Sequence, residues 1–236
     1  MTSEGMKVRT RRASRVQDAV RILFLLDHCP HPGSECLAHP DAVTVLRGQK
    51  KLQAFDFWLR NPDYLADELL NAAEAGRSVP GVSLVDRAAA LLEGDEPDLE
   101  SYPMIRWRYG AYESLDDALA LLVAHGLIGI DAIGTAPDID RWDYCLLPVG
   151  RQDAQEMRSQ EPDLSWYDER AALVLLLAGD RSGSALKELQ YAQGEYERTH
   201  MGEDIAGILP RGRARLAALQ SRVRTVLESD DLGVAS

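Results

Sequence analysis

The first part of the chain carries apolar positions at the spacing of amphipathic helices. Ser14 is a candidate N-cap for the first of these helices, and Pro30 follows its end. The apolar stripe of this helix is formed by Val16, Ala19, Val20, Leu23 and Phe24. The same kind of pattern predicts helices over residues 13–28, 49–59, 62–75 and 83–93.

The pattern changes after an acidic linker at residues 92–101. A helix is predicted over residues 114–125, followed by strands over 127–133 and 141–147 and a helix from Pro148 to about residue 159. A polar turn separates the two strands, and this order of elements is the layout of a winged helix. The second strand carries Trp142 and Tyr144 at alternating positions. The inward side chains of the helix before the strands are expected to be Leu115, Leu119, Leu122 and Val123.

Three further helices are predicted over residues 166–178, 182–199 and 211–228. The expected fold class is therefore mainly α, with a winged helix and its two-stranded wing flanked by N-terminal and C-terminal helical segments. The expected division of the chain is residues 13–94, 102–159 and 162–228.

Composition restricts the class of protein. The chain has 236 residues, 45% hydrophobic and 27% charged, which is typical of a folded globular protein. No apolar stretch has the length of a membrane span, and no apolar signal core follows Met1, so no membrane association is expected. Three cysteines cannot close a disulfide framework, so we expect reduced thiols and a cytoplasmic location.

The net charge of −12 is unevenly distributed, because residues 7–15 and 211–224 are basic and contain no acid. The acidic remainder repels a phosphate backbone, so DNA contact is expected to be weak or to occur only within a complex. The alternative for each basic segment is a solvated tail or helix face. The candidate contacts are Lys7, Arg9, Arg11, Arg12, Arg15, Arg211, Arg213 and Arg215, with the Lys50–Lys51 pair and the arginines near residue 107 as further candidates.

One loop contains residue types that zinc prefers, namely His28, Cys29, His31, Cys36 and His39. Their spacing matches no standard zinc finger, and the chain has no second Cys-x-x-Cys pair. The preferred interpretation is a polar loop with one cysteine packed against the core. We expect no bound metal.

Catalytic and nucleotide-binding motifs are not found in the sequence. It has no Gly-x-Ser-x-Gly elbow, no P-loop and no Gly-x-Gly-x-x-Gly fingerprint. The run Ser182-Gly-Ser184 is interpreted as the cap of a helix. We therefore expect neither an enzyme nor a cofactor, and a small metalloenzyme built on the His/Cys loop is the enzymatic alternative.

Several motifs occur in the order found in a known family. They are Ile105-Arg-Trp-Arg-Tyr-Gly-Ala-Tyr112, the sequence His-Gly-Leu-Ile ending at Ile128, Ser182-Gly-Ser-Ala-Leu-Lys-Glu-Leu-Gln-Tyr191 and Gly202-Glu-Asp-Ile205. Over residues 100–208 the chain resembles the winged-helix middle components of ABC-three-component systems, which are encoded beside SMC-like ATPases in bacterial antiphage defence. The chain departs from the family pattern at Ala111-Tyr112-Glu113 and at Leu146-Leu147. The resemblance implies an adaptor whose partner is an SMC-like ATPase.

The helix before the predicted wing argues against reading of DNA in the major groove. It begins Glu113-Ser-Leu-Asp-Asp117, and no Lys or Arg occurs between Glu113 and Asp140. Aromatic residues on a turn that is exposed according to the resemblance favour a protein partner. The candidate partner-binding residues are Arg106, Trp107, Arg108, Tyr109 and Tyr112. The alternative function is a winged-helix DNA-binding regulator that dimerises through its C-terminal helices.

Overall fold

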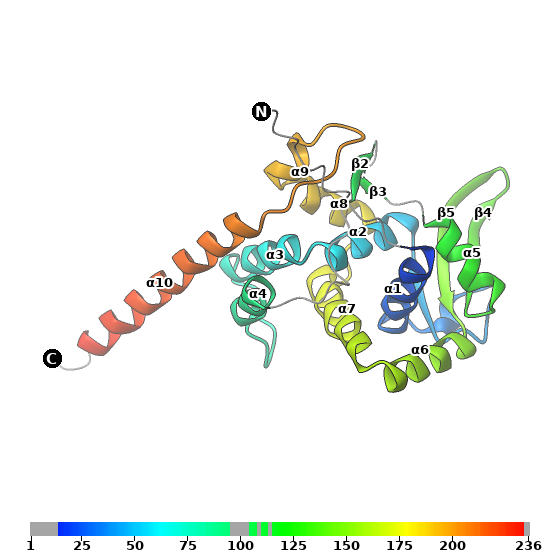
Figure 1. Ribbon diagram of the computed structural model, residues 1–236, viewed down its shortest axis with the longest axis horizontal. Coiled ribbons are helices and arrows are strands. Elements are labelled where there is room, and N and C mark those ends of the chain that lie inside the picture. The colour runs from blue at the N-terminus through cyan, green and yellow to red at the C-terminus, as the bar shows by residue number, and fades with distance from the viewer. Residues whose placement is uncertain (1–13, 95–103, 108–109, 113–114, 234–236) are drawn as a thin grey trace, which may run out of the picture. The chain divides into compact units, whose positions relative to one another are not determined.

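The computed structural model describes residues 14–94, 104–107, 110–112 and 115–233, and the described chain is mainly helical (Figure 1). The chain divides into two compact units, which are described separately. The first unit contains residues 1–60 and 101–205, and the second contains residues 61–100 and 206–236. This division differs from the three consecutive segments expected from the sequence, because each unit combines two separate stretches of chain.

The first unit contains a three-stranded antiparallel sheet in the order β1-β5-β4. Both strands of the expected wing are present and form a hairpin, β4 (Ile128–Thr135) and β5 (Asp138–Leu146). The third strand, β1 (Thr44–Arg47), pairs with β5 and is not among the predicted elements. Four residues are too short a pattern to distinguish a strand from a loop, and the pairing with β5 makes this segment a strand.

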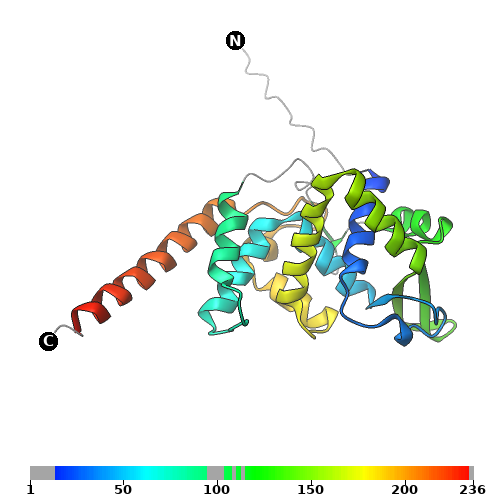
Figure 2. The ribbon, with the colours of Figure 1, turned by 90° about the horizontal axis from the view of Figure 1, so that it is seen from below.

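Helices α1, α2 and α5 contact this sheet, and α1 also contacts α5, α6 and α7 (Figures 1 and 2). The helices of this unit are α1 (Arg15–Asp27), α2 (Gln49–Arg60), α5 (Asp116–Ala124), α6 (Pro148–Gln160), α7 (Ser165–Ala178), α8 (Gly183–Tyr191) and α9 (Gly194–Arg198), with short 3-10 turns η1 (Gly33–Glu35) and η2 (Pro162–Leu164).

Helix α1 begins as predicted but is buried more widely than expected. Ser14 caps it, and Gln17 completes a capping box. The expected apolar stripe is only partly correct, since Val16 is exposed whereas Leu23 and Phe24 are buried. Burial extends around most of the helix as far as Leu26, because helices and the sheet cover it on several sides. A single apolar stripe is therefore too narrow a description of this helix.

A buried group of charges joins α1 to α2. Arg21 is 1% exposed, and its Nε donates to Asp56 Oδ1 at 2.5 Å while its Nη2 donates to Asp18 Oδ1 at 2.5 Å. Arg60 lies 3.4 Å from the second oxygen of Asp56. Burial alone would raise the pKa of Asp56, but the two arginines together hold it below its ordinary value. The four charges therefore compensate one another inside the unit.

A second, two-stranded hairpin lies beside α8 and α9. It consists of β2 (Ile105–Trp107) and β3 (Gly110–Tyr112), whereas the family resemblance implies an exposed turn for this segment. The backbone of Arg106 exchanges hydrogen bonds with Glu203 and Gly202, which fixes β2 to the chain after α9. The single helix expected over residues 182–199 is divided into α8 and α9 by a break at Ala192 and Gln193.

A disulfide joins Cys36 to Cys145, and this corrects the expectation that all thiols are reduced. The two cysteines are 109 residues apart in the sequence, so their spacing gives no indication of a pair. The pairing of β1 with β5 places Val45 opposite Cys145, and Cys36 packs against both in one buried cluster. The remaining cysteine, Cys29, is free and buried.

The described part of the second unit consists of three helices, α3 (Pro62–Glu74), α4 (Leu84–Glu93) and α10 (Leu209–Gly233). The helices predicted over residues 62–75, 83–93 and 211–228 correspond to them. Ser83 caps α4 through the amide of Asp86, and the Tyr64 hydroxyl donates to the carbonyl of Ala206 at 2.8 Å. The side chains of α10 are described as far as Arg222.

The other predicted helices of the first unit are present, with most ends shifted by one or two residues. Leu115, which precedes α5, and Leu119 and Leu122 within it are buried as expected, but Val123 is 43% exposed. Residues 95–101 of the expected linker at 92–101 lie outside the described residues. Among the helices that the structure describes, none combines the length and apolar character needed to span a membrane.

Candidate functional site

The His/Cys loop does not bring its five candidate ligands together. Cys36 is in the disulfide, and the ring of His39 lies against Gly129, where a Cβ would be 2.3 Å from it. His31 faces Glu35, with Nδ1 3.9 Å from a carboxylate oxygen. Within the described part of the chain, no three His, Cys, Asp or Glu side chains form a group that could hold a metal ion.

Cys29 is enclosed at the end of α1. Its Sγ donates to the carbonyl of Leu25 at 3.4 Å, and burial raises the pKa of the thiol to about 12. The thiol is therefore protonated at neutral pH, whereas a nucleophilic cysteine must be a thiolate. Its environment is that of a core residue.

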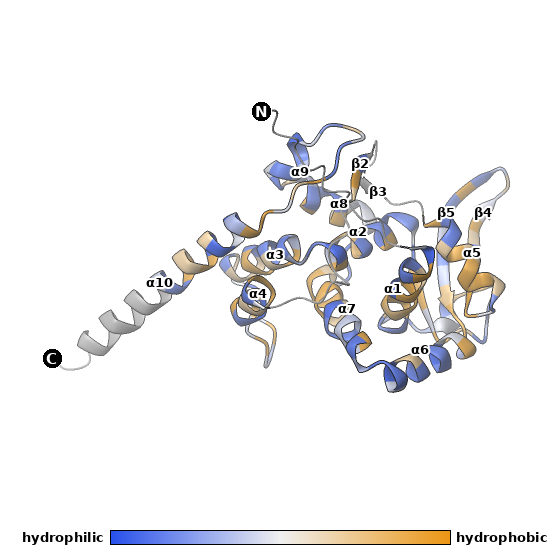
Figure 3. Cartoon of the chain, viewed as in Figure 1, coloured by the Kyte–Doolittle hydropathy of each residue, from blue (hydrophilic) through white to orange (hydrophobic). Residues whose placement is uncertain are grey.

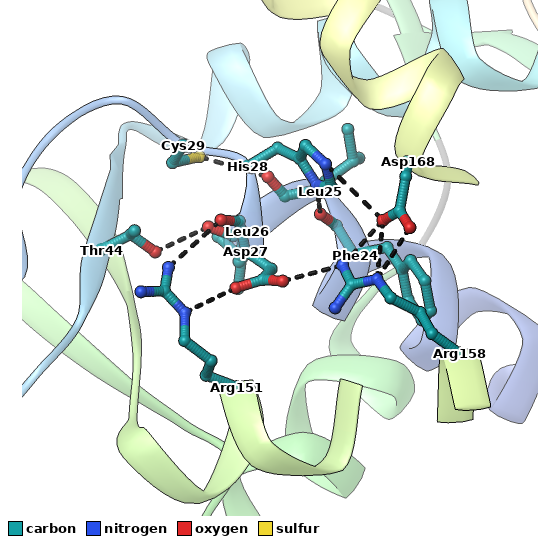
Figure 4. A network of polar contacts seen from close by, with 10 residues as sticks. All are labelled: Phe24, Leu25, Leu26, Asp27, His28, Cys29, Thr44, Arg151, Arg158 and Asp168. Atoms are coloured by element: carbon teal, nitrogen blue, oxygen red, sulfur yellow. Dashed lines mark hydrogen bonds and ion pairs between the residues drawn. The ribbon is translucent and has the colours of Figure 1, made fainter. Parts of the chain in front are cut away.

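A polar network connects the end of α1 to α6 and α7 (Figure 4). Asp27 pairs with Arg151 and Arg158 at 2.8 Å each, and Arg158 pairs in turn with Asp168 at 2.7 Å. His28 Nε2 lies 3.6 Å from a carboxylate oxygen of Asp168. The charges of the network are paired within the unit, so the network holds three helices together.

Arg106, expected to bind a partner, makes contacts within its own unit. Its Nη1 donates to the carbonyls of Tyr196, Glu197 and Thr199 at the end of α9. Its guanidinium also lies 5.4 Å from the ring centroid of Tyr191. The structure therefore gives Arg106 a role in holding the hairpin to α9.

The other candidate partner-binding residues are described in part or not at all. Arg108 and Tyr109 lie outside the described residues. Trp107 and Tyr112 lie on the hairpin strands, where the structure describes their backbone.

The basic segments expected to contact nucleic acid are also only partly described. Lys7, Arg9, Arg11 and Arg12 lie outside the described residues, and Arg15 is exposed at the start of α1.

The three candidate arginines of α10 have partners in the second unit. Arg211 and Arg215 approach Asp67 at 3.4 and 2.8 Å, and Arg215 also pairs with Glu74. Arg213 donates to the carbonyl of Leu92 at 2.7 Å. These contacts attach α10 to α3 and α4.

The first unit contains an open cavity of about 690 Å³, which we call the basic pocket. Four separate segments line it, namely His31 in the loop after α1, the β1–α2 junction, β5, and the turn that leads into α8. A basic cavity contrasts with the net charge of −12 that the whole chain carries. The charged side chains of its lining are Arg47, Lys50, Lys51, Arg141 and Arg181, with Asp140 and Asp180 as the acids.

The three arginines of the pocket already have partners. Arg47 pairs with Glu35 at 2.5 Å, and Arg141 makes two hydrogen bonds to Asp143, which raise the pKa of the arginine. Arg181 donates to the carbonyl of Leu177 at the end of α7.

The two lysines of the pocket differ from these arginines. Neither the Lys50 nor the Lys51 ammonium has a hydrogen bond or ion pair with any residue that the structure describes. The pocket therefore contains two ammonium groups that lie outside any ion pair, although Asp180 attracts Lys51 electrostatically.

Two helices begin at the basic pocket. Gly48, with φ of +90°, leads into α2, and Ser182 caps α8 through the amide of Ala185. A Cβ on Gly183 would lie 2.8 Å from the backbone nitrogen of Lys51, so the first turns of α2 and α8 are in contact. The positive ends of two helix dipoles therefore lie at the same cavity.

The exposed face of α5 has a different character. Asp116 and Asp117 are exposed in its first turn, and Ala120, Val123 and Ala124 continue the exposed face. Figure 3 shows α5 as a predominantly hydrophobic helix. The face is acidic at one end and apolar along the rest, and the sequence of α5 contains no Lys or Arg.

Sequence reasoning identifies most parts of the basic pocket but does not combine them. The Lys50–Lys51 pair, the cap at Ser182 and the strand position of Trp142 are each apparent from local patterns. They are distant in the sequence, and only the packing of α8 on α2 and of β1 on β5 brings them together.

Comparison with known proteins adds no relative to this description. No family model, curated protein or solved structure matches the chain.

Proposed function

We propose that the chain is a non-enzymatic winged-helix adaptor that binds a protein partner. The order α1, β1, α2, α5, β4, β5 and the sheet order β1-β5-β4 support the winged-helix part of the proposal. The β4–β5 hairpin is then the wing, and α3, α4, β2 and β3 interrupt the order between α2 and α5.

The exposed face of α5 is the observation that carries the adaptor role. In a winged helix the helix before the wing enters the major groove, with its N-terminal residues nearest the bases. Asp116 and Asp117 are exposed at that position, and phosphates repel them. The exposed Val123 on the same helix suits an apolar contact with another protein.

The nature of the partner follows from the resemblance to the middle components of ABC-three-component systems. We propose an SMC-like ATPase in antiphage defence, with Trp107 and Tyr112 on the β2–β3 hairpin as a second contact region. DNA contact through Arg15 or the basic segment before it is weak, or occurs only within the complex. The alternative remains a winged-helix DNA-binding regulator that forms a homodimer.

Co-expression with an SMC-like ATPase encoded beside this chain tests the proposal. Val123→Glu should abolish co-purification because it places a charge on the apolar part of the α5 face. Val16→Glu is the matched control, since Val16 is an exposed valine on α1 of the same unit. Both variants should keep their melting temperatures within a few degrees.

Two results would contradict the adaptor role. One is equal recovery of the ATPase with Val123→Glu and with the unaltered chain. The other is tight, sequence-specific binding of duplex DNA by the isolated chain at physiological salt, which would favour the regulator.

A further inference from the structure

Lys51 is a buried cation without a polar partner. The residue is 8% exposed, it lines the basic pocket, and its ammonium makes no hydrogen bond or ion pair with any described residue. It lies over the Phe55 ring, 5.7 Å from the centroid. Burial lowers the pKa of Lys51 and outweighs the attraction of Asp180, which makes no ion pair with it. An anion in the pocket would compensate this charge.

The surroundings of Lys51 are suited to a phosphate group. Lys50 is exposed beside it without a polar partner among the described residues, and the N-termini of α2 and α8 meet at the same place. Helix N-termini bind phosphate through their amides and their dipoles. This arrangement uses two helices from distant parts of the chain, which explains why no phosphate-binding motif is apparent in the sequence.

The rest of the pocket is suited to the uncharged part of a nucleotide. Trp142 lines it and is 43% exposed, so its ring is available for stacking on a base. Asp140 and Asp180 would repel a purely anionic ligand but can accept hydrogen bonds from sugar hydroxyls. The volume of about 690 Å³ is in the range of small-molecule sites.

We propose that the basic pocket binds a nucleoside phosphate, with Lys50, Lys51 and the two helix N-termini holding the phosphate and Trp142 stacking on the base. The nucleotide is either free or the 5′-phosphorylated end of a nucleic acid strand. This site does not depend on the adaptor role, since none of its residues lies on the α5 face.

Calorimetric titration of the full chain tests the site with ADP, adenosine, pyrophosphate and a short oligothymidylate with or without a 5′-phosphate. ADP or the 5′-phosphorylated strand should bind at least about tenfold more tightly than adenosine or the unphosphorylated strand. The tighter of the two phosphorylated probes identifies the source of the ligand.

Variants test the residues. Lys50→Met and Lys51→Met should each weaken binding of the tighter probe by about tenfold or more, whereas Arg87→Met, which removes an exposed cation outside the pocket, should not. Trp142→Ala should weaken ADP binding and leave pyrophosphate binding unchanged. If Lys51→Met lowers the melting temperature, Lys50→Met and Trp142→Ala still decide the question.

The proposal is overturned if no phosphorylated probe binds at about 1 mM, or if the lysine variants bind like the Arg87→Met control. Equal binding of the strands with and without a 5′-phosphate, both tighter than the binding of ADP, would also overturn it, because it would show contact with the strand backbone rather than with a nucleoside phosphate. Unchanged ADP binding in Trp142→Ala would overturn the stacking of the base.

Discussion

Arg21 is held inside the first unit by carboxylates from two helices. Asp56 and Asp18 both accept hydrogen bonds from its guanidinium. Burial alone would lower the pKa of Arg21, but these partners outweigh it and raise the pKa above its ordinary value. A buried ion pair adds little net stability, but removing one partner leaves an uncompensated charge. Asp56 is therefore a sensitive position.

We predict that Asp56→Asn lowers the free energy of unfolding by about 3–5 kcal/mol. The reason is that Arg21 and Arg60 would remain buried with one carboxylate fewer. Glu35→Gln is the control, because the Glu35–Arg47 pair is half-exposed and should contribute about 1 kcal/mol or less. Urea unfolding measures the free energy of unfolding of both variants. An equal loss of stability in Asp56→Asn and Glu35→Gln would contradict the prediction.

Asp56 also makes the stability of the fold depend on pH. The pKa of Asp56 is lower in the folded protein than its ordinary value of about 4. The carboxylate therefore stabilises the fold fully above about pH 4, and this contribution is lost as the pH falls through the lower, folded-state pKa. Below about pH 4 the difference in stability between the unaltered chain and Asp56→Asn should narrow, and a constant difference would contradict this.

At the scale of elements, the sequence predicts helices well and short strands poorly. Long apolar patterns and caps such as Ser14 and Ser83 locate helices because they act within a few residues. Strand β1 depends on pairing with the distant strand β5, which no local pattern contains. Strands β2 and β3 pair locally, but they have only three residues each, and a distant bridge joins Ile105 to Asp204. The basic pocket could not be predicted from the sequence, because the elements that form it are distant in the chain and meet only in the fold.

The β2–β3 hairpin supplies a prediction at this scale. Arg106→Met should lower the free energy of unfolding by about 1.5–3 kcal/mol, because carbonyls at the end of α9 lose a charged donor. Hydrogen exchange should also become faster at Gly202 and Ile205, whose amides bond to the hairpin segment. Arg198→Met, which removes an exposed arginine of α9, is the control, and an equal effect would contradict the role of Arg106.

At the scale of the whole molecule, each of the two units is built from two separate stretches of the chain. The second unit combines residues 61–100 with 206–236, and the disulfide in the first unit closes a separation of 109 residues. Composition indicates a folded protein but does not show which distant segments belong together. The disulfide escapes sequence prediction because three cysteines at irregular spacing carry no signal for a single pair.

The Cys36–Cys145 disulfide gives the last prediction. A cross-link that closes a long loop restricts the unfolded chain, so Cys145→Ser should lower the free energy of unfolding of the first unit by about 2–4 kcal/mol. A reductant should destabilise the unaltered chain to a similar extent and leave Cys145→Ser unchanged. Cys29→Ala, which removes the free thiol but not the cross-link, should still respond to the reductant.

Alkylation of the unfolded chain followed by mass measurement gives an independent check of the cross-link. One cysteine, Cys29, should react without reductant, and all three should react after reduction. In the folded chain Cys29 should react slowly at neutral pH, because it is buried and its pKa is raised to about 12. Three reactive thiols before reduction, together with a stability that does not respond to reductant, would contradict the cross-link. The expectation of reduced thiols from the composition would then be correct.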